Sequence, residues 1–446
     1  MHVTEGLPLP PRPDVDQYKK LAKELAAAVK SGSAAAIHSW AKNWFQRLAG
    51  LSGEVGHERG NDQLDGEARR FTAYWTGERT VKNVPPPRPT LAHAQLVIGR
   101  VHGFASWPAL VRHIETLRRQ GSAVARFEEA VDAIVSGEED TLRRLLLEHP
   151  KLATARSSRA HGCTLLHYVS ANGVEGYRQK TPPNVVAITQ LLLAAGADVN
   201  AKAACYGGGD TPLGLTATSM HPARAGVMTP LLETLVAAGA DVNSRDGGWG
   251  IVRACLANGQ PEAAHWLMEH GAHLDLDEAA GMGRLDVVQH FVASDGTLRH
   301  GATPRQLAEG LRYACGYGRD EVVRLLLAAG VEPDLRGDDG VTALHWAAIG
   351  GKPELVELLL HRGAQVDVRD ANHGGTPLEW AVYAWGGEGR DEAEWPAFYR
   401  IVAALVRAGA AISPAWYSGN EVGRHIGQRV AADARMQAAL RGEVHG

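Results

Sequence analysis

The sequence predicts an all-α solenoid of short helix-turn-helix repeats, preceded by a helical module. A first recurring phrase, LLLAAGADVN ending at Asn200, joins an apolar helical run to a glycine turn. A second recurring phrase, GVTALHWAAIGG starting at Gly340, lies upstream of the first in several units. The turn glycines Gly330 and Gly363 lie 33 residues apart, and self-similarity at such a period is typical of stacked repeats.

Residues 1–120 are predicted to form the N-terminal helical module. Two helical periods fall within residues 14–49, where apolar residues recur at three- and four-residue intervals. Residues 50–89 are polar and Gly/Pro-rich, and we expect them to form a loop. Thr90 and Ser106 are suitable N-caps for two further helices that end near residue 118.

One repeat unit can be followed from Gly340 to Asp370. Thr342 opens a first helix with Leu344 on its apolar face, and the pair at 350–351 (Gly-Gly) ends it. A leucine-rich second helix follows and stops before the next glycine turn. Two helices this short bury little surface alone, so each unit must stack on its neighbours.

These phrases resemble the ankyrin repeat, whose period is 33 residues and whose signature contains T-P-L-H-x-A. The resemblance covers residues 121–413 and implies about eight repeats with short β-hairpin tips. Residues 414–446 are expected to be a C-terminal helical cap. The segment LAHAQLVIGRVHGFASWPALVRHIETL resembles one found at the front of bacterial ankyrin-repeat proteins. The resemblance also implies that the signature histidines, His167 and His345, help hold the turn.

Composition excludes several classes of protein. The chain has 446 residues, of which 45% are apolar and 22% charged, as in a folded globular protein. The net charge is −4, and residues 121–446 are acidic, so nucleic acid is not an expected partner of the repeats. No run of 18 apolar residues is present, which predicts no membrane span. The four cysteines form no CxxC pair, which favours a reducing, cytoplasmic location.

No catalytic residues, metal site or cofactor are expected. The sequence has no phosphate-binding loop, dinucleotide fingerprint, HExxH or GxSxG motif. His161, Cys163 and His167 have a spacing that could ligate a metal. His167 is the signature histidine, however, so we interpret this trio as structural.

Two groups of residues are candidates for binding. The resemblance places the first group on the concave face and hairpin tips of the repeats: Trp249, Met282, Tyr317, Asp339, His373, Tyr383 and Trp385. The second group lies in insertions between the two helices of a unit, at 174–184, 218–227 and 386–396: Tyr177, Arg178, His221, Arg224 and Trp395. Aromatic and arginine side chains are common anchors of protein interfaces, and long loops on a rigid scaffold often carry function.

The sequence therefore favours a scaffold that binds another protein, of unknown identity and oligomeric state. Two alternatives stay open. One is an enzyme or small-molecule binder whose pocket is built from the insertions and from His, Trp and Tyr on the concave face. The other is a DNA-associated regulator that uses residues 90–118, which have the pattern of two helices joined by a short turn.

Overall fold

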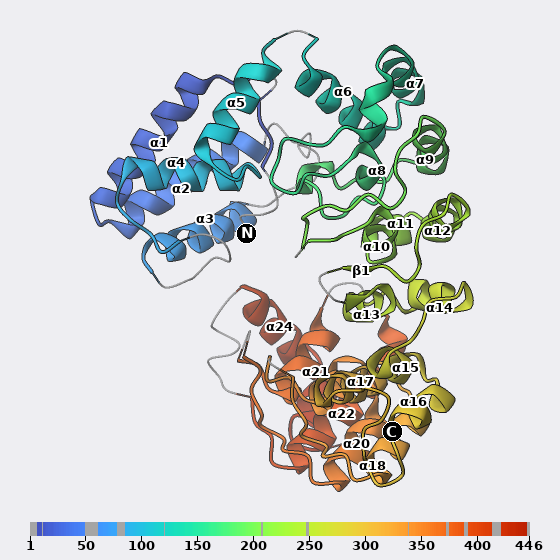
Figure 1. The fold of residues 1–446 in the computed structure, drawn as a ribbon. Coiled ribbons are helices and arrows are strands. Elements are labelled where there is room, and N and C mark those ends of the chain that lie inside the picture. Colours follow the sequence, from blue (N-terminus) through green and yellow to red (C-terminus); the bar gives the residue numbers. More distant parts are fainter. Residues whose placement is uncertain are drawn as a thin grey trace. The chain divides into compact units, whose positions relative to one another are not determined.

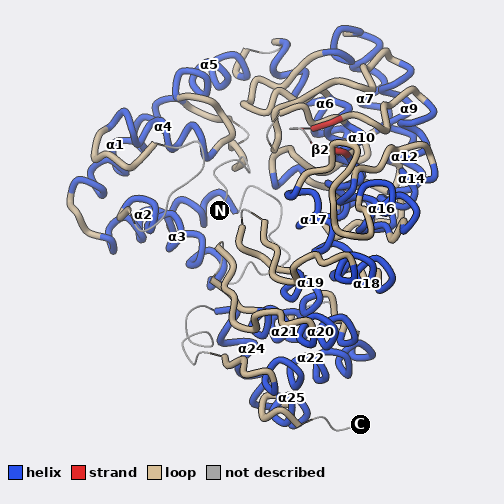
Figure 2. Tube along the Cα trace, turned by 60° about the horizontal axis from the view of Figure 1, so that its bottom comes forward, coloured by secondary structure: helices blue, strands red, loops and turns tan. Residues whose placement is uncertain are grey.

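The computed structural model describes residues 7–10, 12–49, 61–77, 85–119, 121–206, 208–246, 249–337, 339–371, 374–387, 391–412 and 421–443. The chain divides into two compact units, Met1–Ile251 and Val252–Gly446. Figure 1 shows the helices of both units in chain order. Figure 2 shows how little strand the described residues contain, since β1 (Arg245–Asp246) and β2 (Trp249–Gly250) form their one sheet, an antiparallel pair.

The first unit opens with a helical module of five helices: α1 (Val15–Lys30), α2 (Ala34–Ala49), α3 (Asn61–Trp75), α4 (Leu91–Val101) and α5 (Trp107–Leu117). The predicted N-caps are confirmed, because the Thr90 side chain accepts a hydrogen bond from the amide of His93 and Ser106 accepts one from the amide of Ala109. Aromatic rings fill the core of the module, where Phe71 packs edge-on against Phe45.

Helix α3 corrects one prediction, since it lies inside the segment 50–89 that we expected to be a loop. Its buried residues Leu64, Ala68, Phe71 and Trp75 recur at helical spacing and pack the helix against α2. Charged residues between them and the Gly-rich flank obscure this pattern in the sequence.

The first repeats follow in the same unit. One layer contains α6 (Ala123–Ser136), α8 (Leu165–Tyr168) and α10 (Pro212–Ala217), and the second contains α7 (Glu139–Glu148), α9 (Val185–Ala194) and α12 (Met228–Ala237). The 3-10 turns η1 (Pro150–Thr154) and η2 (Gly176–Arg178) and the short helix α11 (Met220–Arg224) lie in the connections. Two fingers between these repeats are minimal hairpins, closed by isolated bridges of Arg156 with Thr164 and of Ala203 with Asp210.

The second unit continues the two-layer arrangement. Its first-layer helices are α13 (Ile251–Ala257, beginning at the boundary), α15 (Leu276–Met282), α17 (Pro304–Gly316), α19 (Ala343–Ile349) and α21 (Pro377–Gly386). Its second-layer helices are α14 (Pro261–Glu269), α16 (Leu285–Phe291), α18 (Asp320–Ala328), α20 (Pro353–His361) and α22 (Trp395–Arg407), the last preceded by η3 (Glu392–Glu394). Helices α24 (Glu421–Ala432) and α25 (Ala434–Ala439) pack against α21 and α22 at the end.

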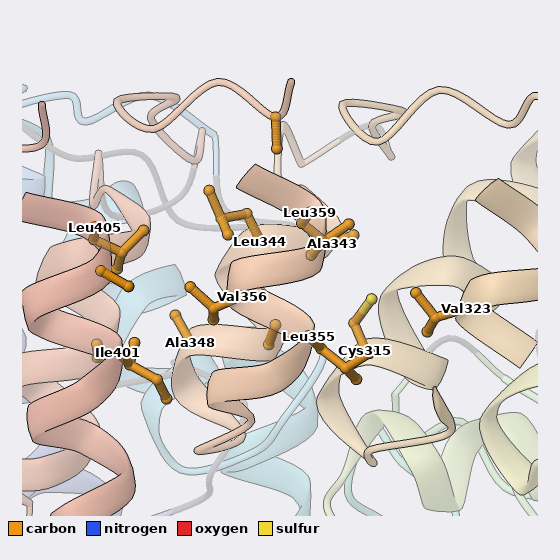
Figure 3. Packing of buried hydrophobic residues seen from close by; sticks show 14 of the residues in the cluster. Cys315, Val323, Ala343, Leu344, Ala348, Leu355, Val356, Leu359, Ile401 and Leu405 are labelled. Atoms are coloured by element: carbon orange, nitrogen blue, oxygen red, sulfur yellow. The ribbon is translucent and has the colours of Figure 1, made fainter. Parts of the chain in front are cut away.

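The core of the second unit is shared between successive repeats. Leu344 on α19, Val356 on α20 and Ile401 on α22 point into one apolar layer, which Figure 3 shows from close by. Cys315 on α17 is fully buried in the same cluster. No repeat has a complete core of its own, so folding of one unit depends on its neighbours.

The described residues contain no helix that is both long and apolar enough to cross a membrane.

Candidate functional site

The first-layer helices of the second unit carry an aromatic residue at one equivalent position in three consecutive repeats. These residues are Tyr313 on α17, Trp346 on α19 and Trp380 on α21, which we call the aromatic row. The Tyr313 and Trp346 rings meet edge-on with centroids 5.2 Å apart. Tyr313 is buried, whereas Trp346 and Trp380 are each half-buried and present part of their surface to solvent.

Two tyrosines at the ends of the same helices extend this surface. Tyr317 follows α17, is half-buried and lies 6.4 Å from Trp346 between ring centroids. Its hydroxyl donates a 2.5 Å hydrogen bond to the carbonyl of Leu256. Tyr383 is 50% exposed, which makes it the most accessible aromatic side chain of this group.

Gly316 provides the space that the indole of Trp346, the central member of the aromatic row, occupies. A Cβ at Gly316 would lie 2.5 Å from Cε3 of Trp346, which is too close for two non-bonded carbon atoms. Gly316 has an ordinary helical backbone, so its missing side chain matters here for space alone. The absence of a side chain at Gly316 therefore leaves the space in which the Trp346 indole packs against the preceding repeat.

Beside the row runs a chain of charges, the ion ladder, in which Arg253, Asp277, Glu309 and Arg312 are buried and Asp339 is half-buried. Arg253 Nε lies 3.3 Å from Asp277 Oδ2, and its Nη2 lies 3.6 Å from Glu309 Oε1. Arg312 pairs with Glu309 through Nη2 and with Asp339 Oδ1 at 2.6 Å through Nη1. The ladder thus links α13, α15, α17 and the finger that precedes α19, and Arg312 directly precedes Tyr313 of the row.

There are more carboxylates than arginines around the ion ladder. The pKa values of two of these carboxylates, Asp277 and Glu278, are raised. Burial raises the pKa of Asp277 to about 6, although Arg253 opposes the shift. Burial also raises the pKa of the neighbouring Glu278 to about 7, with Asp277 adding to the effect. Glu278 accepts hydrogen bonds from the amides of Asp275 at 2.8 Å and Arg253 at 3.2 Å, so it caps α15 as well.

The first unit contains a second group of charges, the ion cluster, in which Glu128, Arg159, Glu175 and Arg178 are buried and Asp132 lies exposed at the edge. Arg178 lies 2.6 Å from Glu128 Oε2 and 2.7 Å from Asp132 Oδ1. Arg159 pairs with Glu175 and lies 3.5 Å from Glu128 Oε2. Burial acts to raise the pKa of Glu128 and of Glu175, but the arginines outweigh it and hold both pKa values below their usual range.

The ion cluster joins the N-terminal module to the first repeats. The Arg159 guanidinium lies over the Phe104 ring at 5.4 Å, and the amide of Ala160 donates to the carbonyl of Gly103 at 2.8 Å. His113 on α5 hydrogen-bonds to Ser158 through Nδ1 at 2.7 Å. Burial lowers the pKa of His113 to about 4, so this imidazole is neutral near pH 7.

Two histidines cap first-layer helices in matching ways. His167 Nδ1 accepts a 3.1 Å hydrogen bond from the amide of Thr164, and its Nε2 lies 3.3 Å from the carbonyl of Asp210 in the next repeat. His345 does the same with Thr342 at 3.2 Å and with the carbonyl of Gly375 at 3.2 Å. Each imidazole therefore ties one repeat to the next, which confirms the predicted role in holding the turn.

Comparison with known proteins identifies these repeats. A family model of ankyrin repeats (3 copies) matches residues 311–395, and a model of the ankyrin repeat matches residues 161–204. The chain is an ankyrin-repeat protein. Ankyrin repeats are protein-interaction modules, and no more specific role follows from the match.

Individual similar proteins add little to this. The chain is 38% identical over 66 residues to the E3 ubiquitin-protein ligase hecd-1 of Caenorhabditis elegans, which is 15% of this chain and only 2% of that protein. The human ASB11 ankyrin repeat domain is 20% identical, with 64% of this chain and 99% of that chain covered and a TM-score of 0.31. The ankyrin repeat domain of Bcl-3 is also 20% identical, with 62% and 97% covered and a TM-score of 0.29.

The ankyrin frame explains where the ion ladder comes from. Counting back from the glycine after each first helix places Arg253, Asp277 and Arg312 at the position of the signature histidine, and Glu309 at that of the signature threonine. The buried pair Glu309–Arg312 thus replaces the Thr–His pair of the ankyrin signature. Sequence reasoning missed the ladder, although aligning the repeats on their glycines would have found it.

Several of the predicted binding residues of this ankyrin-repeat protein are accessible. Trp249 is 38% exposed on β2, Tyr383 and Arg224 are exposed, and Tyr317 and His221 are half-buried. The structure brings Tyr317 and Tyr383 together with the aromatic row on one layer of helices. Trp249 lies in the other unit, and His373 lies outside the described residues.

Three predicted binding residues are buried, and their assignment to an exposed surface is wrong. Trp385 is 1% exposed, because its indole packs against Trp395 and Tyr399 where α21 meets α22. Met282 is 9% exposed at the end of α15. Arg178 is 4% exposed, because the insertion turns inward and places its guanidinium in the ion cluster.

The remaining predicted residues take mainly structural positions. Tyr177 is half-buried beside the ion cluster, with its hydroxyl 3.3 Å from Arg159 Nη2 and its ring 5.3 Å from the Arg178 guanidinium. Asp339 is the last member of the ion ladder. Trp395 is half-buried against Trp385. Among the described residues no group of three or more His, Cys, Asp or Glu could hold a metal ion.

Proposed function

We propose that this protein binds a protein partner through the first-layer helices of its second unit, with Trp346, Trp380 and Tyr383 as the main contacts. The supporting observation is the repetition of a partly exposed aromatic side chain, Trp346 and Trp380, at one position of consecutive repeats. Large aromatic side chains bury much surface at a small cost in conformational entropy, and they dominate interface energetics.

The spacing of the row suggests the form of the partner. Packed helices lie about 8–10 Å apart, so aromatic side chains on successive repeats recur at about that interval. Three residues of extended chain span about 10 Å. An extended partner segment with an apolar side chain at every third residue would therefore place each one against a successive repeat.

Affinity capture tests this proposal. The full chain is immobilised as the native protein and as Tyr383→Ala, and bound proteins are quantified by mass spectrometry. We expect Tyr383→Ala to lower recovery of the specific partner about tenfold, which corresponds to ~1.4 kcal/mol of binding free energy.

Leu147→Ala provides the matched control. Leu147 is 75% exposed on α7, so truncating it removes an exposed apolar group that belongs to the first unit and not to the row. Partner recovery should equal that of the native protein. Equal recovery with Tyr383→Ala as well would show that the partner binds elsewhere.

A further inference from the structure

Two cysteines that are distant in the sequence meet in the first unit. Cys163 precedes α8, and Cys205 lies in the finger that precedes α10 of the next repeat. Their Sγ atoms are 3.4 Å apart, and both residues are reduced thiols. A disulfide requires an S–S distance of about 2.05 Å, so a small movement of one side chain would join them.

The backbone around the two sulfurs keeps them adjacent. The amide of Ala204 donates to the carbonyl of His161 at 2.8 Å, and Arg156 donates to the carbonyl of Lys202 at 2.8 Å. These bonds hold the two successive fingers side by side. Asp210 Oδ2 accepts from the amide of Cys205 at 2.9 Å, which fixes the turn that carries this cysteine.

A glycine provides space for Cys205. A Cβ at Gly173 would lie 2.9 Å from Cys205 Sγ and 2.9 Å from its Cβ, so only glycine permits this approach. The φ of Gly173 is +69°, a conformation that L side chains rarely adopt. Gly173 therefore leaves the space that allows the Cys205 thiol to lie close to Cys163.

The two thiols differ in access. Cys163 is fully buried, whereas Cys205 is half-buried. Burial raises the pKa of the Cys163 thiol, and the neighbouring Cys205 raises it further. A soluble oxidant therefore reaches Cys205 first, and Cys163 is positioned to react with the oxidised product.

We propose that Cys163 and Cys205 form a redox-responsive pair, which hydrogen peroxide oxidises to a disulfide that links two successive ankyrin repeats. In the first step the Cys205 thiolate attacks the peroxide, an S–O bond forms, the O–O bond breaks, and water leaves after protonation. In the second step Cys163 attacks the sulfenic sulfur, the S–S bond forms, the S–O bond breaks, and the leaving hydroxide takes the Cys163 proton. The two thiols supply two electrons and one peroxide becomes two waters.

The link has a physical consequence. It closes a long loop between two repeats, and a cross-link of this kind lowers the conformational entropy of the unfolded chain. The oxidised first unit should therefore melt several °C higher than the reduced one. The same link would fix the finger that carries Tyr206, which is 63% exposed.

Thiol counting and peptide mapping on the full chain test the proposal. The reduced protein is treated with hydrogen peroxide, its remaining thiols are titrated after denaturation, and a digest is analysed by mass spectrometry without reduction. We expect the count to fall from the four cysteines to two. The digest should contain one cross-linked peptide joining Cys163 to Cys205, and dithiothreitol should restore all four thiols.

Three variants separate this pair from other outcomes. Cys255→Ser/Cys315→Ser should still form the link, because those two thiols lie buried in the core of the second unit. Cys163→Ser should leave Cys205 as a sulfenic acid that dimedone labels. Cys205→Ser should leave Cys163 unlabelled. A peroxide-treated native chain in which Cys205 is overoxidised, or pairs with Cys255 or Cys315, would overturn the proposal without any need for the variants.

Discussion

The two units bury charge in different places. In the first unit the ion cluster lies outside the ankyrin signature, where Arg178 of an insertion and Arg159 of a finger meet the carboxylates of α6. In the second unit the ion ladder replaces the signature itself, with Arg312 at the histidine position. The first arrangement joins a helical module to the repeats, and the second joins repeats to one another.

The difference shows how the balance of charge decides the protonation of buried acids. In the first unit the two arginines contact Glu128 and Glu175 closely enough to outweigh burial, so the pKa values of both acids fall. In the second unit burial prevails at Asp277 and Glu278, whose pKa values rise. Buried ion pairs can be replaced as a unit with little loss, whereas removal of one partner leaves an uncompensated charge.

The largest effect is expected for Arg178→Met, which removes one cation from the ion cluster. The buried Glu128 would lose its closest cation, and breaking a buried pair in this way costs about 3–5 kcal/mol. Hydrogen exchange of peptides from the first unit, measured at increasing urea concentration, would give the loss in free energy of unfolding. Arg143→Met is the control, because its pair with Glu139 is half-exposed and contributes at most about 1 kcal/mol. Equal losses of stability in the two variants would contradict the distinction between buried and half-exposed ion pairs.

The two units should also respond to pH in opposite directions. Between the ordinary pKa of 4.5 and the folded value of about 7, Glu278 holds a proton that the unfolded chain has released. The stability that it contributes is therefore complete below about pH 4.5 and is lost as the pH rises to about 7, by roughly 3 kcal/mol. The lowered pKa values of Glu128 and Glu175 act in the other sense, so their contribution is lost as the pH falls below about 4.5.

Hydrogen exchange of α15 and α17, compared with α6 and η2 from about pH 3 to 7.5, checks this pH response. Protection in the second unit should fall as the pH rises, once intrinsic exchange rates are corrected. Glu278→Gln should flatten that fall and leave the first unit unchanged. A profile in the second unit that is unaffected by this substitution would show that Glu278 is ionised throughout.

A double substitution tests whether the ion ladder replaces the Thr–His pair. Arg312→His alone leaves Glu309 buried without its closest cation, and we expect a loss of about 2–3 kcal/mol. Glu309→Thr/Arg312→His restores the two residues found at 342 and 345, and should stay within about 1 kcal/mol of the native protein. The coupling in a double-mutant cycle measured by urea unfolding gives the result. Additive losses would show that the two positions do not act together.

The smallest effect is expected for Gly316→Ala. The added methyl group would displace the Trp346 indole, since overpacking of this kind costs about 1–3 kcal/mol and this indole is half-exposed and able to move. Tryptophan fluorescence and unfolding would report the shift. Gly66→Ala is a suitable comparison, because the nearest atom to a Cβ there is 4.0 Å away. If both variants left the fluorescence unchanged, the claim that the Trp346 indole packs in the space at Gly316 would be wrong.

Much of the fold could be predicted because the residues that start and end helices recur from repeat to repeat. Thr342, the glycines after α19 and the turn at Gly363 mark one unit, and the same marks recur along the chain. Helix α3 lacks such marks, and its apolar residues stand between charged ones in a Gly-rich neighbourhood. Its helix depends on packing against α2, which no local pattern reports.

The site could be predicted only in part, because burial is set by contacts between distant residues. Tyr317 and Tyr383 follow from their place at the end of a first helix, and both are accessible. Arg178 has the sequence context of an exposed loop, yet its nearest acid, Glu128, lies 50 residues away in the chain. Trp385 likewise owes its burial to Trp395 and Tyr399 on the next helix.

The most direct test of the proposed function places a photo-reactive group on the aromatic surface. Tyr383 is replaced by p-benzoylphenylalanine in one full-length protein and Leu147 in another, and each is irradiated in the presence of cell extract. We expect a covalent product with one protein partner from position 383 and none from position 147. The same product from both positions, or a product from position 147 alone, would contradict binding through the second unit's first-layer helices.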